Sequence, residues 1–72
     1  MDWKLQRVAL RKMAHLNNAR DLQTLGQLPG NRLKSLKGRL SDYHSIRIND
    51  QWRVIFRWKN GDAYNVQIVD YH

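Results

Sequence analysis

Residues 43–71 read YHSIRINDQWRVIFRWKNGDAYNVQIVDY, and this stretch decides the fold. β-branched and aromatic residues alternate with polar ones over Tyr43–Ile48, Trp52–Lys59 and Ala63–Val69, which is typical of β-strands. The polar stretches Asn49–Gln51 and Asn60–Asp62 between them favour tight turns. The sequence therefore predicts an antiparallel meander of three strands over about residues 43–71.

Three-residue loops at both turns would sort the side chains of the meander onto two faces. The apolar face would pair Ile46 with Val54, Ile48 with Trp52, Phe56 with Val66, Trp58 with Tyr64, and Ile68 with Val54. The opposite face would hold Tyr43, Arg47, Arg53, Arg57, Asn65, Gln67 and Tyr71, with Ile55 and Val69 among them. One face therefore needs a cover, and the other combines arginine with tyrosine.

The N-terminal part of the chain has the period of a helix. From Asp2 to about His15 the apolar residues recur at steps of three and four, as one stripe of an amphipathic helix that continues to the next residue: Leu5, Val8, Ala9, Met13 and Leu16. A shorter helix is predicted over Ala19–Leu25, capped by the Asn17-Asn18 pair and stopped by Gly26. We expect these helices, over about residues 2–25, to cover the apolar face of the sheet.

Residues 27 to 42 are predicted to form an ordered basic loop. It opens with Leu28-Pro29-Gly30-Asn31, which has the composition of a turn. Four cations follow within eight residues, with no acid among them: Arg32, Lys34, Lys37 and Arg39. A short strand is expected near Lys34–Leu36.

The composition restricts the class of protein and the kind of partner. Seventy-two residues allow one domain, 1–72. Thirteen Lys and Arg against six Asp give a formal charge of +7, which favours a polyanionic partner: nucleic acid, an anionic membrane surface or an acidic protein. Without cysteine the chain cannot form a disulfide or a thiolate metal site.

The sequence shows neither a membrane-spanning run nor a signal-peptide pattern, so we expect a cytoplasmic protein that does not bind a membrane.

Three arginines on one sheet face are the most informative feature. Arg47, Arg53 and Arg57 offer forked donors to phosphate, and tyrosine rings can stack on unpaired bases. The alternative is that these arginines are only the solvated side of a half-buried sheet. Because Asp70 is the one acid expected nearby, the set favours contact with nucleic acid.

The sequence ends with Asp70, Tyr71 and His72, which combine a carboxylate, a phenol and an imidazole. Such groups can act as general acid, general base and orienting group, whereas the alternative is a frayed terminus. Metal binding is disfavoured, since His15, His44 and His72 lack the spacing of ligands and there is no Cys or Glu.

Several motifs of the chain resemble those of the HigB toxins, the plasmid-maintenance killer proteins of the RelE/ParE superfamily. They are Gly30-Asn31-Arg32-Leu33, Leu36-Lys37-Gly38, SIRINDQWR at 45–53, Phe56-Arg57-Trp58, and the stretch from Asn60 to His72. The resemblance covers about Leu5 to His72, and the block from Ser45 onward matches in order and spacing without gaps. It implies an α+β, RelE-like fold in which N-terminal helices pack on one face of an antiparallel sheet.

The resemblance also implies a function: the toxin of a type II toxin-antitoxin system. Such a toxin is a ribosome-dependent, metal-independent endoribonuclease that cuts mRNA and blocks translation, with no cofactor. Its implied partners are the ribosome, mRNA and a HigA-type helix-turn-helix antitoxin. The toxin is expected to contact operator DNA only indirectly, in its complex with the antitoxin. The ribose 2′-hydroxyl attacks the adjacent phosphate, so the protein must position the strand and stabilise charge.

Site residues can be carried over one by one from this resemblance. The catalytic residues it implies are Arg47, Arg53, Asp70, Tyr71 and His72. The residues expected to bind RNA are Arg32, Lys34, Lys37, Arg39 and Arg57.

Two departures from the HigB pattern stand out. Lys34 occupies a position where some relatives have a histidine, and a lysine is a poor base at neutral pH, so we expect it to bind phosphate. The strand with which HigB toxins usually begin is missing before Leu5, so the sheet is expected to lack a strand and expose an edge. Two alternatives remain open: a ParE-like inhibitor of DNA gyrase, and a truncated RNA-binding homologue without catalysis.

Overall fold

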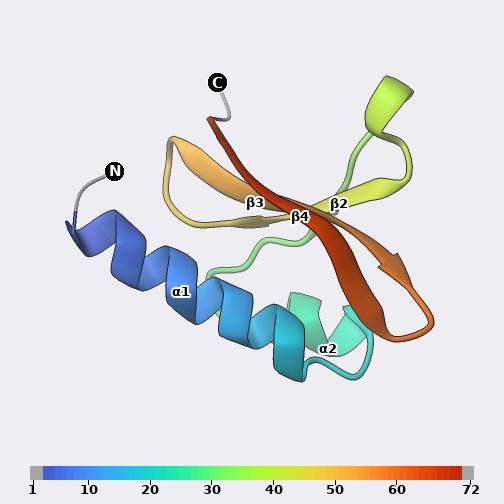
Figure 1. Ribbon diagram of the computed structural model, residues 1–72, viewed down its shortest axis with the longest axis horizontal. Coiled ribbons are helices and arrows are strands. Elements are labelled where there is room, and N and C mark those ends of the chain that lie inside the picture. The colour runs from blue at the N-terminus through green and yellow to red at the C-terminus, as the bar shows by residue number, and fades with distance from the viewer. Residues whose placement is uncertain (1–2, 71–72) are drawn as a thin grey trace.

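The computed structural model describes residues 3–70, which form two helices packed on one side of an antiparallel sheet (Figure 1). The elements are α1 (Trp3–Asn18), α2 (Leu22–Gln27), β1 (Lys34–Ser35), the 3-10 helix η1 (Gly38–Leu40), β2 (Tyr43–Arg47), β3 (Trp52–Lys59) and β4 (Asp62–Asp70). The strand order is β1-β2-β3-β4, so β1 and β4 are the edges of the sheet. The predicted α+β architecture is confirmed. Asp2, Tyr71 and His72 lie outside the described residues.

The first helix is longer than the sequence pattern predicts. α1 continues past His15 to Asn18, and the amide of Ala19 still donates to the carbonyl of His15 at 3.0 Å. The predicted helix end near His15 and the predicted cap of the next helix by the Asn17-Asn18 pair are therefore wrong. No helix in residues 3–70 is long and apolar enough to cross a membrane.

The second helix begins and ends later than predicted. Its N-cap is Asp21, whose carboxylate accepts a hydrogen bond from the backbone amide of Thr24 at 2.7 Å. Gly26 lies inside the helix rather than stopping it. A Cβ at Gly26 would stand 3.1 Å from the Leu33 side chain, so the glycine allows the helix to approach the loop before β1 closely.

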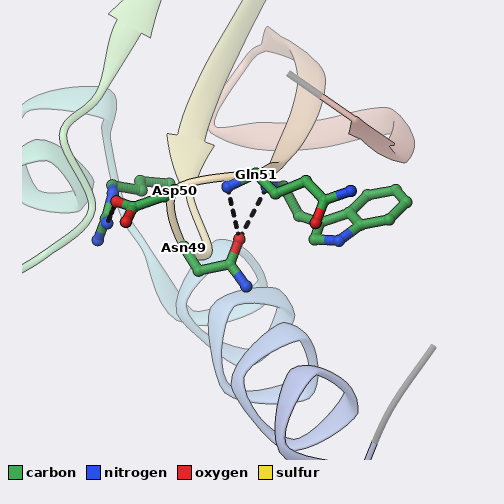
Figure 2. Close-up of polar contacts among 5 residues, drawn as sticks. Asn49, Asp50 and Gln51 are labelled. Atoms are coloured by element: carbon green, nitrogen blue, oxygen red, sulfur yellow. Dashed lines mark hydrogen bonds and ion pairs between the residues drawn. The ribbon is translucent and has the colours of Figure 1, made fainter. Parts of the chain in front are cut away.

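The first turn of the meander forms as predicted. The carbonyl of Trp52 accepts from the amide of Ile48 at 3.0 Å, which leaves three residues in the loop. The Asn49 side-chain oxygen accepts from the amides of Gln51 and Trp52, at 2.9 and 2.8 Å (Figure 2). Asparagine stabilises this turn because its short side chain reaches the amides two and three residues ahead.

The second turn differs from the predicted three-residue loop. Lys59 pairs with Asp62, so only Asn60 and Gly61 connect the strands. Their φ angles of 54° and 82° are both positive, as in the two-residue turns that match the twist of a hairpin. Asparagine and glycine tolerate this conformation better than other residues do, and this tolerance selects the shorter loop.

A bulge in β4 changes part of the predicted register. Val54 pairs with Ile68 as predicted, but the pairing shifts between Ile55 and Arg57. Arg57 pairs with Tyr64, and an extra residue stands opposite β3 at Asn65, whose φ is 53°. The predicted pairing of Trp58 with Tyr64 is therefore wrong, since Trp58 pairs with Ala63, and Tyr64 lies on the face of Arg57.

The hydrophobic core lies between the helices and the sheet. Four of its side chains are completely buried, and each stabilises the fold by about 1.5–3 kcal/mol: Leu25, Ile46, Val54 and Phe56. α1 contributes Leu5, Ala9 and Leu16 to the same cluster. The expected short strand near Lys34–Leu36 forms as β1, which pairs Lys34 with Ser45 and so brings the basic loop to the sheet.

Candidate nucleic-acid interface

The sheet face that points away from the helices carries the predicted arginines, and we name it the arginine face: Tyr43, Ser45, Arg47, Arg53, Ile55, Arg57 and Tyr64. Strand register places these residues together, because Arg47 pairs with Arg53, and Arg57 pairs with both Tyr43 and Tyr64. Its centre is buried, since Ser45, Arg53 and Ile55 are each at most 5% exposed. The face is therefore not the uniformly solvated surface that simple alternation predicts.

Arg53 lies inside the protein. Its Nε donates to the Ser45 hydroxyl at 2.9 Å, and its Nη2 donates to the backbone carbonyl of Arg32 at 2.7 Å. A guanidinium can satisfy several acceptors at once, which suits it to this buried position. Arg53 thus ties β2 and the loop before β1 to β3.

Arg47 and Arg57 are partly exposed, and each has an acidic partner that sequence reasoning missed. Arg47 forms an ion pair with Asp50 in the first turn. Arg57 lies 3.7 Å from the carboxylate of Asp42. Because the Asp50 side chain is fully exposed, solvent screens this pair and a phosphate can compete for the guanidinium.

A groove of about 320 Å³ adjoins Arg57 at one end of the arginine face. Arg57 lies 5.3 Å from the centre of the Tyr64 ring, in a cation–π arrangement. His44 also lines this groove, and its Nδ1 is 3.2 Å from the Ser35 hydroxyl. An aromatic ring beside a cation is a platform on which an unpaired base can stack.

The four cations of the basic loop are all exposed: Arg32, Lys34, Lys37 and Arg39. Lys34 lies in β1 beside β2, and Arg32 is held through its carbonyl by Arg53. Lys37 is the N-cap residue of η1 and Arg39 lies within η1. The structure thus brings Arg32 and Lys34 to the sheet that carries Arg47.

Asp70 is the last residue of β4. It pairs with Trp52 at the end of β4, and the Gln51 side chain donates to its carboxylate at 3.1 Å. Strand alternation puts it on the helix side of the sheet, opposite Arg53. Tyr71 and His72, the other two residues of the expected catalytic ending, lie outside the described residues.

The sequence analysis does not predict the burial of two polar residues, Lys12 and Asn31. Lys12 is 5% exposed, and its Nζ donates to the Asn31 side-chain oxygen. Burial lowers the pKa of Lys12, and the nearby Arg11 and Arg47 lower it further. The helical period of the sequence indicates that Lys12 is buried, since Lys12 lies three residues after Ala9 and four before Leu16, both in the core. Within residues 3–70, no three His or Asp side chains gather as metal ligands would.

Comparison with known proteins agrees with this architecture. Residues 2–72 match the family model of RelE-like toxins of the type II toxin-antitoxin system HigB. The chain belongs to the HigB-like toxin family. Membership implies an antitoxin partner, because type II toxins are paired with one.

Two curated relatives carry HigB names. Toxin HigB-1 of Vibrio cholerae serotype O1 is 38% identical over 64 residues, which are 89% of this chain and 67% of the relative. Endoribonuclease HigB of Proteus vulgaris is 44% identical over 41 residues, which are 57% of this chain and 45% of the relative. The matched part of the chain thus spans about two thirds of one HigB-like relative and less than half of the other.

Proposed function

We propose that this HigB-like toxin is an endoribonuclease that cleaves mRNA on the ribosome, blocks translation and is held inactive by a HigA-type antitoxin. The observation that carries the proposal is the family match over residues 2–72, together with the name Endoribonuclease HigB of the Proteus vulgaris relative. Such an activity belongs in the cytoplasm, where messages are translated. Operator DNA would be reached only through the antitoxin.

The arrangement of cations supports an RNA substrate. Arg47 is partly exposed and paired with a solvent-exposed carboxylate, while Arg32 and Lys34 extend the positive charge from the adjoining loop. Together they can bind consecutive phosphates of a single strand. The Arg57–Tyr64 groove at the other end of the face offers a place for a base.

The proposed reaction is attack of a ribose 2′-oxygen on the adjacent phosphorus. The new 2′-O–P bond forms as the bond from phosphorus to the 5′-oxygen breaks. A base removes the 2′-hydroxyl proton, and an acid protonates the leaving 5′-oxygen. We assign to Arg47 the stabilisation of negative charge on the phosphate. Proton transfer and the orientation of the reacting groups are assigned to Asp70, Tyr71 and His72. Arg53, which is buried, would act by holding Arg32 in place.

Expression of the chain without antitoxin tests the proposal. We expect growth arrest, and cuts in translated messages but not in naked RNA. Equal cleavage of naked RNA would contradict the dependence on ribosomes. Inhibition of DNA supercoiling by gyrase without any RNA cleavage would instead assign the chain to the ParE-like alternative.

Variants of Tyr71 and His72 test the catalytic assignment. Tyr71→Ala is expected to abolish single-turnover cleavage on programmed ribosomes, and Tyr71→Phe separates the hydroxyl from the ring. Removal of His72 is expected to cause a partial loss, because an imidazole can both accept and donate a proton. Antitoxin binding serves as the control for folding. Full cleavage by Tyr71→Ala would overturn this assignment.

A further inference from the structure

Lys12 is a buried cation in α1 whose hydrogen-bond partner within residues 3–70 is the neutral side chain of Asn31. Its Nζ donates to the Asn31 side-chain oxygen, and its charged neighbours Arg11 and Arg47 are themselves cations. A buried charge without a counter-ion costs stability, and an apolar side chain of the same length would avoid this cost. The position of Lys12 therefore calls for a reason other than the stability of the core.

Asn31, the partner of Lys12, is completely buried and anchored on three sides. Its side-chain oxygen accepts from Lys12, and its side-chain nitrogen donates to the carbonyl of Leu25 at 3.0 Å. Its backbone carbonyl accepts from the amide of Arg47 at 2.6 Å. One residue thus joins α1, α2 and the strand that carries Arg47.

The residue that follows Asn31 has an unusual backbone conformation. Arg32 has a φ of 45°, in the left-handed region that residues other than glycine rarely adopt. Such strain persists where the surroundings fix the backbone, and it concentrates at functional sites. Asn31 fixes the chain before Arg32, and Arg53 holds the Arg32 carbonyl at 2.7 Å. The Arg32 side chain is exposed at the end of this rigid support.

We propose that Lys12 is a positioning residue that acts through Asn31 to hold Arg32 beside the strand of Arg47, so that both arginines can bind the phosphates of one RNA strand. The inference rests on the proposed function, because it specifies how that site binds its substrate. Lys12 itself contacts no RNA. Its effect on RNA binding passes entirely through Arg32.

A double-mutant cycle on RNA affinity tests the proposal, with a short single-stranded RNA as the probe. Lys12→Met keeps the length and volume of the side chain but removes the ammonium group. Lys4→Met is the matched control, because Lys4 is exposed on the same helix and carries the same charge. We expect Lys12→Met and Arg32→Ala each to weaken RNA binding about tenfold, the size of one charge-assisted hydrogen bond. Lys12→Met should change the melting temperature little, because removal of the buried charge offsets the loss of the donor to the buried Asn31 oxygen. Lys4→Met should have a much smaller effect on affinity.

The cycle distinguishes positioning from general electrostatics and from folding. If Lys12 acts through Arg32, adding Lys12→Met to Arg32→Ala lowers the affinity no further. Additive effects, or equal effects of Lys12→Met and Lys4→Met, would overturn the inference and leave the proposed function intact. If Lys12→Met does not fold, Lys12→Gln takes its place, and failure of both to fold would make Lys12 purely structural and overturn the inference. Absence of RNA binding and of cleavage by the wild-type chain would instead refute the proposed function itself.

Discussion

The side chain of Arg53 donates a hydrogen bond to the backbone carbonyl of Arg32 at 2.7 Å. The two residues lie 21 positions apart, one in the central strand β3 and one in the loop that precedes β1. This contact makes the loop part of the sheet's rigid framework. Arg53, which the sequence places on the face expected to contact nucleic acid, is buried. It holds the backbone of Arg32, a second cation, in position.

Arg53→Ala should therefore destabilise the fold as well as impair activity. The substitution leaves the Ser45 hydroxyl and the Arg32 carbonyl without their buried donor, which costs about 1–3 kcal/mol for each unsatisfied group. Urea unfolding followed by circular dichroism measures the loss, and Arg57→Ala on the same face is the partly exposed control. A midpoint equal to that of the wild type would show that the guanidinium contributes no net stability.

The Tyr64 ring, which lies beside Arg57, is expected to stack on an unpaired RNA base. Tyr64→Leu removes the ring and should weaken binding of a short single-stranded RNA by about 1–3 kcal/mol. Tyr64→Phe keeps the ring and should bind nearly as well as the wild type. Fluorescence anisotropy at fixed salt compares the three proteins. Equal affinity of the Leu and Phe variants would exclude stacking at this position.

The sequence predicted the strands and most of the first hairpin because local alternation decides them. Ile46, Val54 and Ile68 each follow a polar residue in the chain, so their shared face follows from period two. The bulge at Asn65 was missed, since one added residue on an edge strand leaves the local pattern unchanged. Its consequence is that Tyr64 lies beside Arg57.

The contents of the site were harder to predict than its location. Arginines on one face were expected, but their partners come from other segments: Asp42 precedes β2, and Arg32 precedes β1. Burial of Arg53 depends on these long-range contacts, which no local pattern encodes. Lys12 could have been found, because its place in the helical stripe put a charged residue on the core side.

Asp21 should make the stability of the protein depend on acid pH. The amide and hydroxyl of Thr24 at the start of α2 hold the pKa of Asp21 below its ordinary value of 3.8. The unfolded chain therefore takes up this proton first as the pH falls, and the stabilisation is lost as the pH drops through the folded-state pKa. Asp21→Ala should lower the melting temperature at pH 7, and its difference from wild type should shrink below about pH 3.8. Asp21→Asn, which retains an N-cap oxygen, should show a smaller loss at pH 7. A difference that stays constant down to pH 2 would contradict the assignment.

Lys34 and Lys37 should contribute to RNA binding through charge alone. Both side chains are exposed, and a lysine that neutralises one phosphate of a single strand releases about 0.7 of a counterion. Lys34→Ala and Lys37→Ala should therefore each reduce the slope of log affinity against log salt by about 0.7, uniformly across RNA sequences. Arg20→Ala is the control, because Arg20 is an exposed cation between α1 and α2, away from the basic loop. Affinities measured at four or more salt concentrations give the slopes. If Arg20→Ala reduced the slope as much as the loop variants do, RNA would be held by the overall charge of the chain rather than by this loop.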